Sequence, residues 1–193
     1  MSSDYLSGVK PWTSTGERLL ARTRIFDLNE KDWTCEEDAS KSGSFVQIRS
    51  RDWVNVIAVT PSDELVMVEQ FRFGSECVTL EPVAGIVEAG EDPMETCRRE
   101  LREETGYVSD GGVKRIGWTY TNPAILTNKC HYGLLTDVRP TGERSFDQHE
   151  QLATRLVPVA DAPGLIAKGV ITHALAVCAV HFYMADRAAG PTG

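Results

Sequence analysis

The sequence predicts an α/β sandwich with a small additional β-sheet at its N-terminal end. Apolar runs of strand length alternate with helical segments along most of the 193 residues. The runs at residues 52–60 and 64–71 are apolar almost throughout, which is typical of a sheet covered on both faces. Helices interleaved with such strands pack against the sheet. A chain of this length can form one domain with a sizeable core and a small appendage.

The first 50 residues contain short strand-like stretches at residues 22–28 and 44–49, separated by the polar stretch 29–43. They predict a small sheet. Because so small a sheet cannot bury a core of its own, we expect the segment 1–50 to mediate a homodimer. The main domain is then expected at residues 51–193.

The main domain begins with strands at residues 52–60 and 64–71. They are joined by the proline-led turn Pro61-Ser62-Asp63, so we expect them to pair as a hairpin. A further strand at residues 79–83 leads to Gly85. The elements expected after residue 106 are strands at 113–121, 131–137 and 152–159, followed by helices at 161–168 and 172–187.

The clearest helix lies between Asp92-Pro93 and Gly106. Proline in the first turn loses no hydrogen bond and presets φ, and glycine just past the end accepts the left-handed cap conformation. Apolar side chains recur within this segment at spacings of three and four residues, which predicts one buried face. They are Met94, Cys97 and Leu101.

Three carboxylates share another face of the same helix. At about 100° per residue, Glu100, Glu103 and Glu104 fall within roughly one third of the circumference. Like charges at this spacing repel, and Arg99 offsets only part of the charge by pairing with Glu103. A hard divalent cation with oxygen ligands would neutralise the patch, so we expect a Mg²⁺ or Mn²⁺ site. The alternative for these three residues is a solvated helix face.

Charge and cysteine content restrict the class of partner and the compartment. The net charge of −8 argues against nucleic acid and acidic membrane surfaces as partners. Five cysteines form an odd set without C-x-x-C spacing or a signal peptide, which predicts reduced thiols in the cytoplasm. No apolar run reaches the 18 or so residues that a membrane span needs, so we expect a soluble protein.

The run from Gly85 to Tyr107 reads G-x5-E-x7-R-E-L-x-E-E-x-G-Y and resembles the signature box of the Nudix hydrolases. The resemblance implies an αβα sandwich with a mixed β-sheet. It also implies hydrolysis of a nucleoside diphosphate linked to another group, by attack of a metal-activated water on phosphorus.

The resemblance also assigns roles by position. It implies that Glu100 and Glu104 are the main metal ligands and that Glu103 is a further ligand or a catalytic group that orients water. Arg99 is implied to hold the acids in place, and the backbone carbonyl of Ala84 to be an additional ligand.

The residues before the box resemble the branch that cleaves ADP-ribose and nucleoside diphosphate sugars. These are Glu69-Gln70-Phe71-Arg72 and Leu80-Glu81-Pro82-Val83-Ala84-Gly85. The resemblance implies that Arg72 binds substrate phosphates, for which its planar fork is suited, and that Glu81 lies near the substrate or metal. A surface salt bridge is the alternative for Arg72. Pro123 stands where relatives place a substrate-binding proline, and a plain turn is its alternative.

The segment Asp147-Gln148-His149-Glu150 corresponds by position to a catalytic acidic loop. Glu150 matches a metal ligand or general base best, with Asp147 and His149 as alternatives. The other histidines, which are His131, His173 and His181, match no motif and are expected to be structural. The substrate base is expected to stack on one of the aromatic residues Trp12, Trp33, Trp53 or Phe71.

The resemblance and the residues together predict a Mg²⁺-dependent pyrophosphatase. It would split ADP-ribose or a related nucleoside diphosphate sugar into a nucleoside monophosphate and a sugar phosphate. Two alternatives remain: a sensing module that binds such a nucleotide without turnover, and a hydrolase of another diphosphate such as coenzyme A or a dinucleoside polyphosphate.

Overall fold

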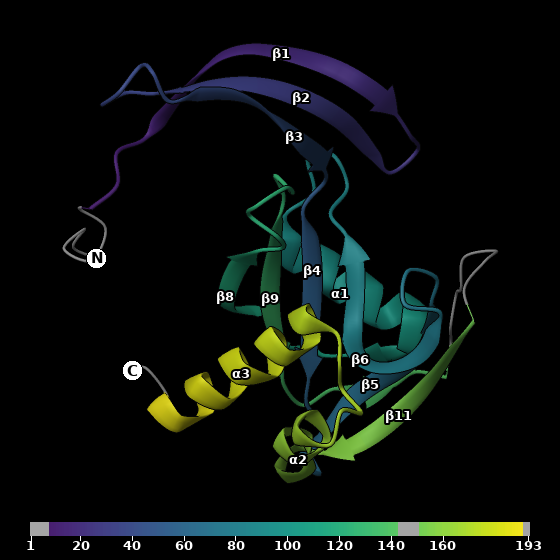
Figure 1. Ribbon diagram of the computed structural model, residues 1–193. Coiled ribbons are helices and arrows are strands. Elements are labelled where there is room, and N and C mark those ends of the chain that lie inside the picture. Colours follow the sequence, from purple (N-terminus) through teal and green to yellow (C-terminus); the bar gives the residue numbers. More distant parts are fainter. Residues whose placement is uncertain (1–7, 143–150, 191–193) are drawn as a thin grey trace. The chain divides into compact units, whose positions relative to one another are not determined.

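The computed structural model describes residues 8–142 and 151–190 (Figure 1). Its backbone contacts divide the chain into two compact units. The smaller holds the chain up to Arg51 together with residues 120–128, and the larger holds the rest.

The smaller unit is a three-stranded antiparallel sheet in the order β1-β2-β3, formed by β1 (Trp12–Arg22), β2 (Phe26–Cys35) and β3 (Ser42–Ser50). The expected strand at residues 22–28 is wrong, because the β1–β2 turn falls inside it, closed by Thr23 N–H donating to Phe26 O at 3.0 Å. The polar stretch 29–43 is also not a connection, since β2 runs through half of it.

The bounds of these strands could not be predicted from an apolar pattern, because the sheet buries little of its own surface and its residues are largely polar. Nearly every residue of β1 is exposed. Charged pairs cross between the strands: Arg18 binds Glu30 at 2.6 Å and Arg49 binds Glu17 at 2.5 Å. The segment 120–128 joins this unit through Ile48, whose N–H donates to Ile125 O at 2.8 Å.

The larger unit is built on a six-stranded mixed sheet in the order β11-β5-β6-β4-β9-β8. Its strands are β4 (Trp53–Ala58), β5 (Glu64–Arg72), β6 (Cys77–Ile86), β8 (Lys114–Tyr120), β9 (Lys129–Leu135) and β11 (Leu152–Pro158). β4 and β9 are parallel, whereas β6 is antiparallel to both β4 and β5. A separate short ladder joins β7 (Tyr107–Val108) to β10 (Arg139–Pro140).

The expected hairpin between β4 and β5 is wrong, although both strands exist. β6 lies between them: it pairs with β5 over residues 77–82 and with β4 over residues 83–86. The turn after β4 is tight, with Thr60 N–H donating to Glu64 O at 2.9 Å, and a single bridge joins Val59 to Leu65. Beyond that bridge the strands diverge, because the edges of β4 are taken by β6 and β9.

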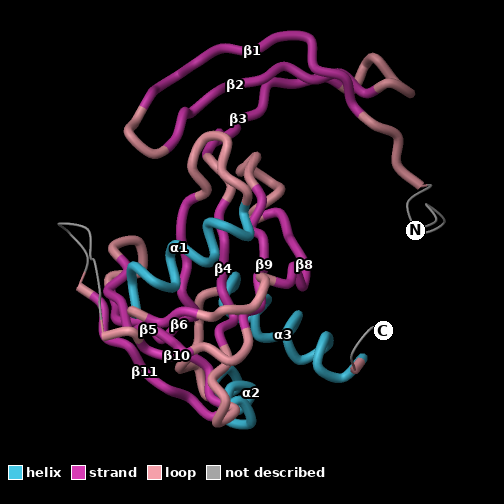
Figure 2. The backbone as a smooth tube through the Cα atoms, turned by 180° about the vertical axis from the view of Figure 1, so that it is seen from behind, coloured by secondary structure: helices cyan, strands magenta, loops and turns pink. Residues whose placement is uncertain are grey.

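Helices cover both faces of this sheet, as expected. α3 (Ala174–Ala189) lies in front of the strands in Figure 1, and α1 (Pro93–Thr105) lies in front of them in Figure 2, which is the view from behind. A short helical segment, η2 (Val159–Asp161) followed by α2 (Ala162–Ala167), precedes α3. The αβα sandwich is therefore confirmed.

Alternate residues of the strands enter two separate cores. Val54, Val56, Val66 and Val68 pack with Cys97 and Leu101 of α1. Ile57, Leu65 and Met67 pack with the buried face of α3, formed by Leu175, Ala176, Ala179, Val180 and Tyr183. Burial on both faces explains why β4 and β5 read as continuous apolar runs.

α1 begins and ends where the sequence predicts. Asp92 caps the start, accepting Met94 N–H at 2.7 Å. Gly106 closes the end in the left-handed conformation with φ 71°. Within the described ranges, no helix combines the length and apolar character needed to cross a membrane. All five cysteines are free thiols.

Candidate active site

The acid patch of α1 is organised around one guanidinium. Arg99 Nη1 donates to both Glu100 Oε1 and Glu103 Oε2, each at 2.9 Å. Its Nε and Nη2 donate to the two oxygens of Glu91, at 3.0 and 3.2 Å. Arg99 thus joins three carboxylates, two from the helix and one from the loop before it.

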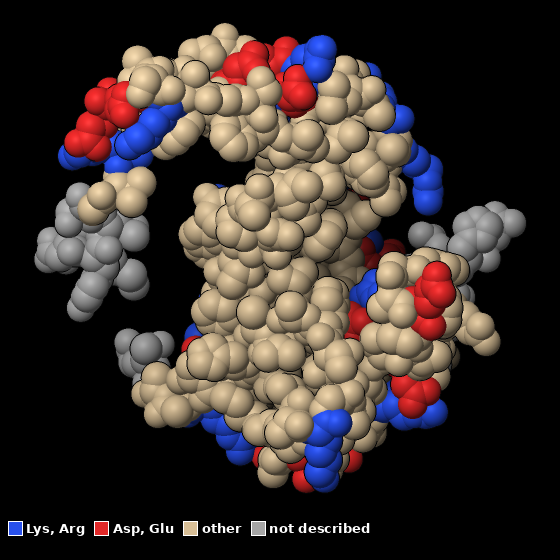
Figure 3. Space-filling model, viewed as in Figure 1, with Lys and Arg blue, Asp and Glu red and all other residues tan. Residues whose placement is uncertain are grey.

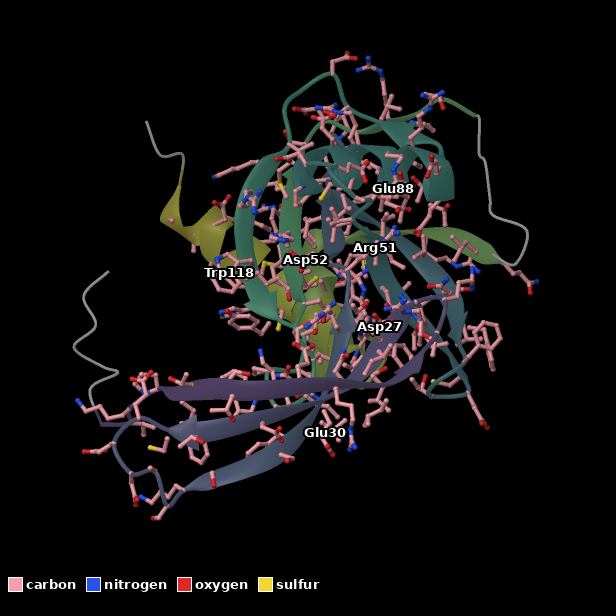
Figure 4. All side chains as sticks on the ribbon, turned by 90° about the horizontal axis from the view of Figure 1, so that it is seen from above. Asp27, Glu30, Arg51, Asp52, Glu88 and Trp118 are labelled. Atoms are coloured by element: carbon pink, nitrogen blue, oxygen red, sulfur yellow. The ribbon has the colours of Figure 1, made fainter. Side chains whose placement is uncertain are left out.

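The loop between β6 and α1 is held by the same carboxylate that binds Arg99. Glu91 Oε2 accepts the backbone N–H of Glu88 at 3.1 Å. The hydrogen bonds from Arg99 lower the pKa of Glu91 to about 2, so it is ionised at neutral pH. The loop begins beside β4, since Val87 N–H donates to Asp52 O at 2.9 Å; Figure 4 labels Asp52 and Glu88 at this end of the sheet.

Gly85 gives Glu100 room to approach the end of β6. A Cβ atom at Gly85 would lie 2.1 Å from both Cδ and Oε1 of Glu100. No side chain larger than hydrogen can occupy this position while Glu100 keeps its place. The close approach brings the Glu100 carboxylate to the strand end that carries Ala84 and Gly85.

A second network surrounds Glu81, whose side chain is fully buried. Arg72 binds it with both arms of its fork, Nε to Oε1 at 3.0 Å and Nη2 to Oε2 at 2.8 Å. Thr79 Oγ1 lies 2.5 Å from Oε1 and His173 Nδ1 lies 2.6 Å from Oε2. Burial raises the pKa of Glu81, but these hydrogen bonds outweigh it and hold the pKa far below its ordinary value.

Glu104, on the same helix as Arg99, is 5% exposed. The hydrogen bond to Glu81 raises the pKa of Arg72, and the negative charge of Glu104 raises it further. Arg72 is therefore close enough to Glu104 to feel its charge. The face shown in Figure 3 is largely uncharged, with both signs mixed along its margins.

The larger unit holds most of the residues that the sequence singles out. Arg72, Glu81, Ala84, Arg99, Glu100, Glu103 and Glu104 all belong to it. Pro123 belongs to the smaller unit, in an exposed turn where Ile125 N–H donates to Asn122 O at 3.1 Å. Asp147, His149 and Glu150 lie outside the described residues.

The candidate stacking aromatics are divided between the units. Trp12 and Trp33 lie in the smaller one. In the larger unit, Trp53 packs against the core on the α3 side, and Phe71 is 45% exposed beside Phe73. Phe71 is the candidate ring nearest in sequence to Arg72.

His173, which the sequence marks only as a structural residue, contacts the buried carboxylate of Glu81. His173 precedes α3 and matches no motif, and its partner Glu81 is 92 positions away. His131 is also ordered by polar contacts, with Asp52 at 2.9 Å and Arg115 at 3.0 Å.

Comparisons with known proteins show the family of the chain. Residues 49–179 match the NUDIX domain. The chain is 30% identical over 173 residues to the ADP-ribose pyrophosphatase of Bacillus subtilis, covering 88% of this chain and 93% of that protein. It is 50% identical to the methanol dehydrogenase activator of Bacillus methanolicus over 84 residues, which cover 44% of this chain and 45% of that protein.

A solved structure supports the fold independently. The crystal structure of an ADP compounds hydrolase superposes with a TM-score of 0.82 at 21% identity, covering 95% of this chain and 98% of that one. A domain match over more than half of the chain and a relative that aligns over nearly its whole length show that the chain belongs to the Nudix hydrolase family, in the branch that contains ADP-ribose pyrophosphatases.

Proposed function

We propose that this Nudix hydrolase cleaves the diphosphate bond of ADP-ribose or a related nucleoside diphosphate sugar, with Mg²⁺ or Mn²⁺. The products are a nucleoside monophosphate and a sugar phosphate. The observation that carries the proposal is the close approach of Glu100 to Gly85, which places an acid of the Nudix box, joined to Glu103 through Arg99, at the end of β6. The relatives named as acting on ADP-ribose and ADP compounds support this substrate class.

The donor set suits a hard divalent cation. Carboxylates and a backbone carbonyl are oxygen ligands, and Mg²⁺ takes a few of them while keeping waters and substrate phosphate oxygens. No group of three or more His, Cys, Asp or Glu in residues 8–142 and 151–190 forms a ready metal cage. A site completed by phosphate and water does not require one. The groups that would hold the cation are Ala84 O, Glu100, Glu103, Glu104 and Glu150.

The bound cation would neutralise diphosphate charge and lower the pKa of attacking water. The chain's own residues supply the rest. Arg99 keeps Glu100 and Glu103 together, and Arg72 orients a phosphate through N–H groups that Glu81 does not use. The oxygen of the attacking water bonds to phosphorus while the bridging P–O bond breaks. A carboxylate, that of Glu103 or Glu150, accepts the proton that the water loses.

Turnover should depend on a divalent metal ion. Wild type should hydrolyse ADP-ribose, ADP-glucose or GDP-mannose with Mg²⁺ and lose this activity with a chelator. Glu104→Gln should slow hydrolysis about 100-fold or more, because it removes a buried negative charge from the site. Product analysis by chromatography gives the rates.

Glu95→Gln is the matched control, since Glu95 lies on the exposed side of α1 and pairs with Arg98 at 3.7 Å. Its activity should stay near that of wild type. If wild type and Glu104→Gln are equally slow on every diphosphate, the proposed function is wrong. Binding without turnover in calorimetry would favour a sensing module instead.

Gly85→Ala should inactivate a folded enzyme. The new Cβ would displace the Glu100 carboxylate, which can swing aside, so the fold is retained. Misplacing a reacting group by about 1 Å lowers the rate about 100-fold. Circular dichroism and steady-state rates measure the two effects. Gly112→Ala is the control, because a Cβ there meets nothing within 4 Å; equal rates for both variants would refute this role of Gly85.

We also propose that residues 1–50 mediate a cytoplasmic homodimer, with residues 51–193 as the hydrolase domain and Pro123 as a substrate contact. The support for a dimer is the exposed apolar content of the β1–β3 sheet, which includes Leu19, Leu20, Phe45 and Val46. Light scattering at micromolar concentration should give twice the 21.3 kDa chain mass. A monomer mass would contradict the proposal.

A further inference from the structure

His173 has an orientation that its own helix does not explain. It occupies the N-cap position of α3, where a side chain commonly accepts a backbone N–H, yet it makes no side-chain capping bond. Its Nδ1 lies 2.6 Å from Glu81 Oε2 instead. The imidazole is therefore directed to the buried carboxylate that holds Arg72.

Glu81 needs this contact because a fully buried carboxylate is costly unless each oxygen is well hydrogen-bonded. Oε1 accepts from Arg72 and Thr79, and Oε2 accepts from Arg72 and His173. An ionised carboxylate only accepts, so the Nδ1 of His173 carries the proton and donates it. The donors come from three elements: β5, β6 and the start of α3.

The orientation of Arg72 depends on that of Glu81. A guanidinium has five N–H groups, and Glu81 takes two of them in a planar, bidentate pair. The plane of the Glu81 carboxylate therefore sets the direction of the other three N–H groups of Arg72. Thr79 holds one carboxylate oxygen, and His173 is the contact from outside β5 and β6 that holds the other.

We propose that His173 is a positioning residue for substrate phosphate, acting through Glu81 to fix the fork of Arg72. The inference rests on the proposed function, because it takes the group bound by Arg72 to be a phosphate of the diphosphate substrate. When His173 is absent, Arg72 samples more orientations and fewer molecules are competent to bind.

The packing of α3 does not depend on the imidazole. The side chain of His173 is 33% exposed, whereas α3 is anchored by buried residues such as Leu175, Ala179 and Tyr183. Substitution at His173 should leave the fold intact at a modest cost in stability, because Glu81 Oε2 keeps one of its two donors. A purely structural role would change stability alone and leave KM unchanged.

The test compares His173→Ala, His173→Asn and wild type on the diphosphate that wild type hydrolyses fastest. His173→Ala should raise KM about tenfold and leave kcat unchanged. A tenfold loss of substrate affinity is what one hydrogen bond to a charged group contributes. Asparagine carries an N–H close to the position of Nδ1, so His173→Asn should restore KM. Loss of kcat at unchanged KM, or no rescue by asparagine, would overturn the proposal.

His181→Ala is the matched control, because His181 lies on the same helix and is exposed. It should behave as wild type. Arg72→Ala provides a second check through a double-mutant cycle. If His173 acts through Arg72, His173→Ala should add no further rise in KM once Arg72 is removed, whereas additive effects would contradict the proposal.

A readout without turnover separates this inference from the proposed function. In ¹⁵N NMR spectra of the free protein, His173 should carry its proton on Nδ1, and the Arg72 Nε–H signal should broaden or shift in His173→Ala. If the substrate panel fails while this change occurs, the proposed function is wrong and the coupling stands. An unchanged Arg72 signal would overturn the coupling whatever the substrate.

Discussion

The arrangement of the site depends on the ion pairs of Arg99. Acids on one face of a helix repel one another, so positive charge between Glu100 and Glu103 stabilises their arrangement. Arg99 supplies it with hydrogen bonds of 2.9 Å to each. Because its other N–H groups bind Glu91, the same guanidinium also fixes the loop between β6 and α1. Gly85 then allows Glu100 to reach the end of β6.

Two arginines divide the work of the site. Arg99 concentrates carboxylates where we propose that a divalent cation binds. Arg72 is held by the buried carboxylate of Glu81, and we propose that its remaining N–H groups bind phosphate. The acids come from α1 and His173 precedes α3, so elements on opposite faces of the sheet contribute to the proposed centre.

Local signals made α1 predictable from the sequence. The helix ends are marked by Asp92-Pro93 and Gly106, and the spacing of the acids predicts one shared face. Each of these signals involves residues close together in sequence, and each agrees with the structure. The pairing of residues 52–60 with 64–71 was predicted wrongly because β6, from later in the chain, separates the strands. β1 was missed because an exposed strand has no apolar alternation. The contact of His173 with Glu81 could not be predicted from the sequence, since the two residues lie 92 positions apart.

The most direct test is the effect of Glu103→Gln on the free energy of unfolding, measured by denaturant titration in chelator at low salt. With Arg99 present, the substitution removes a salt bridge of 2.9 Å and should destabilise the protein. In an Arg99→Met background it removes a repelling charge and should stabilise it. This change of sign is the predicted result. The same effect in both backgrounds would contradict the claim that Arg99 balances the acid patch.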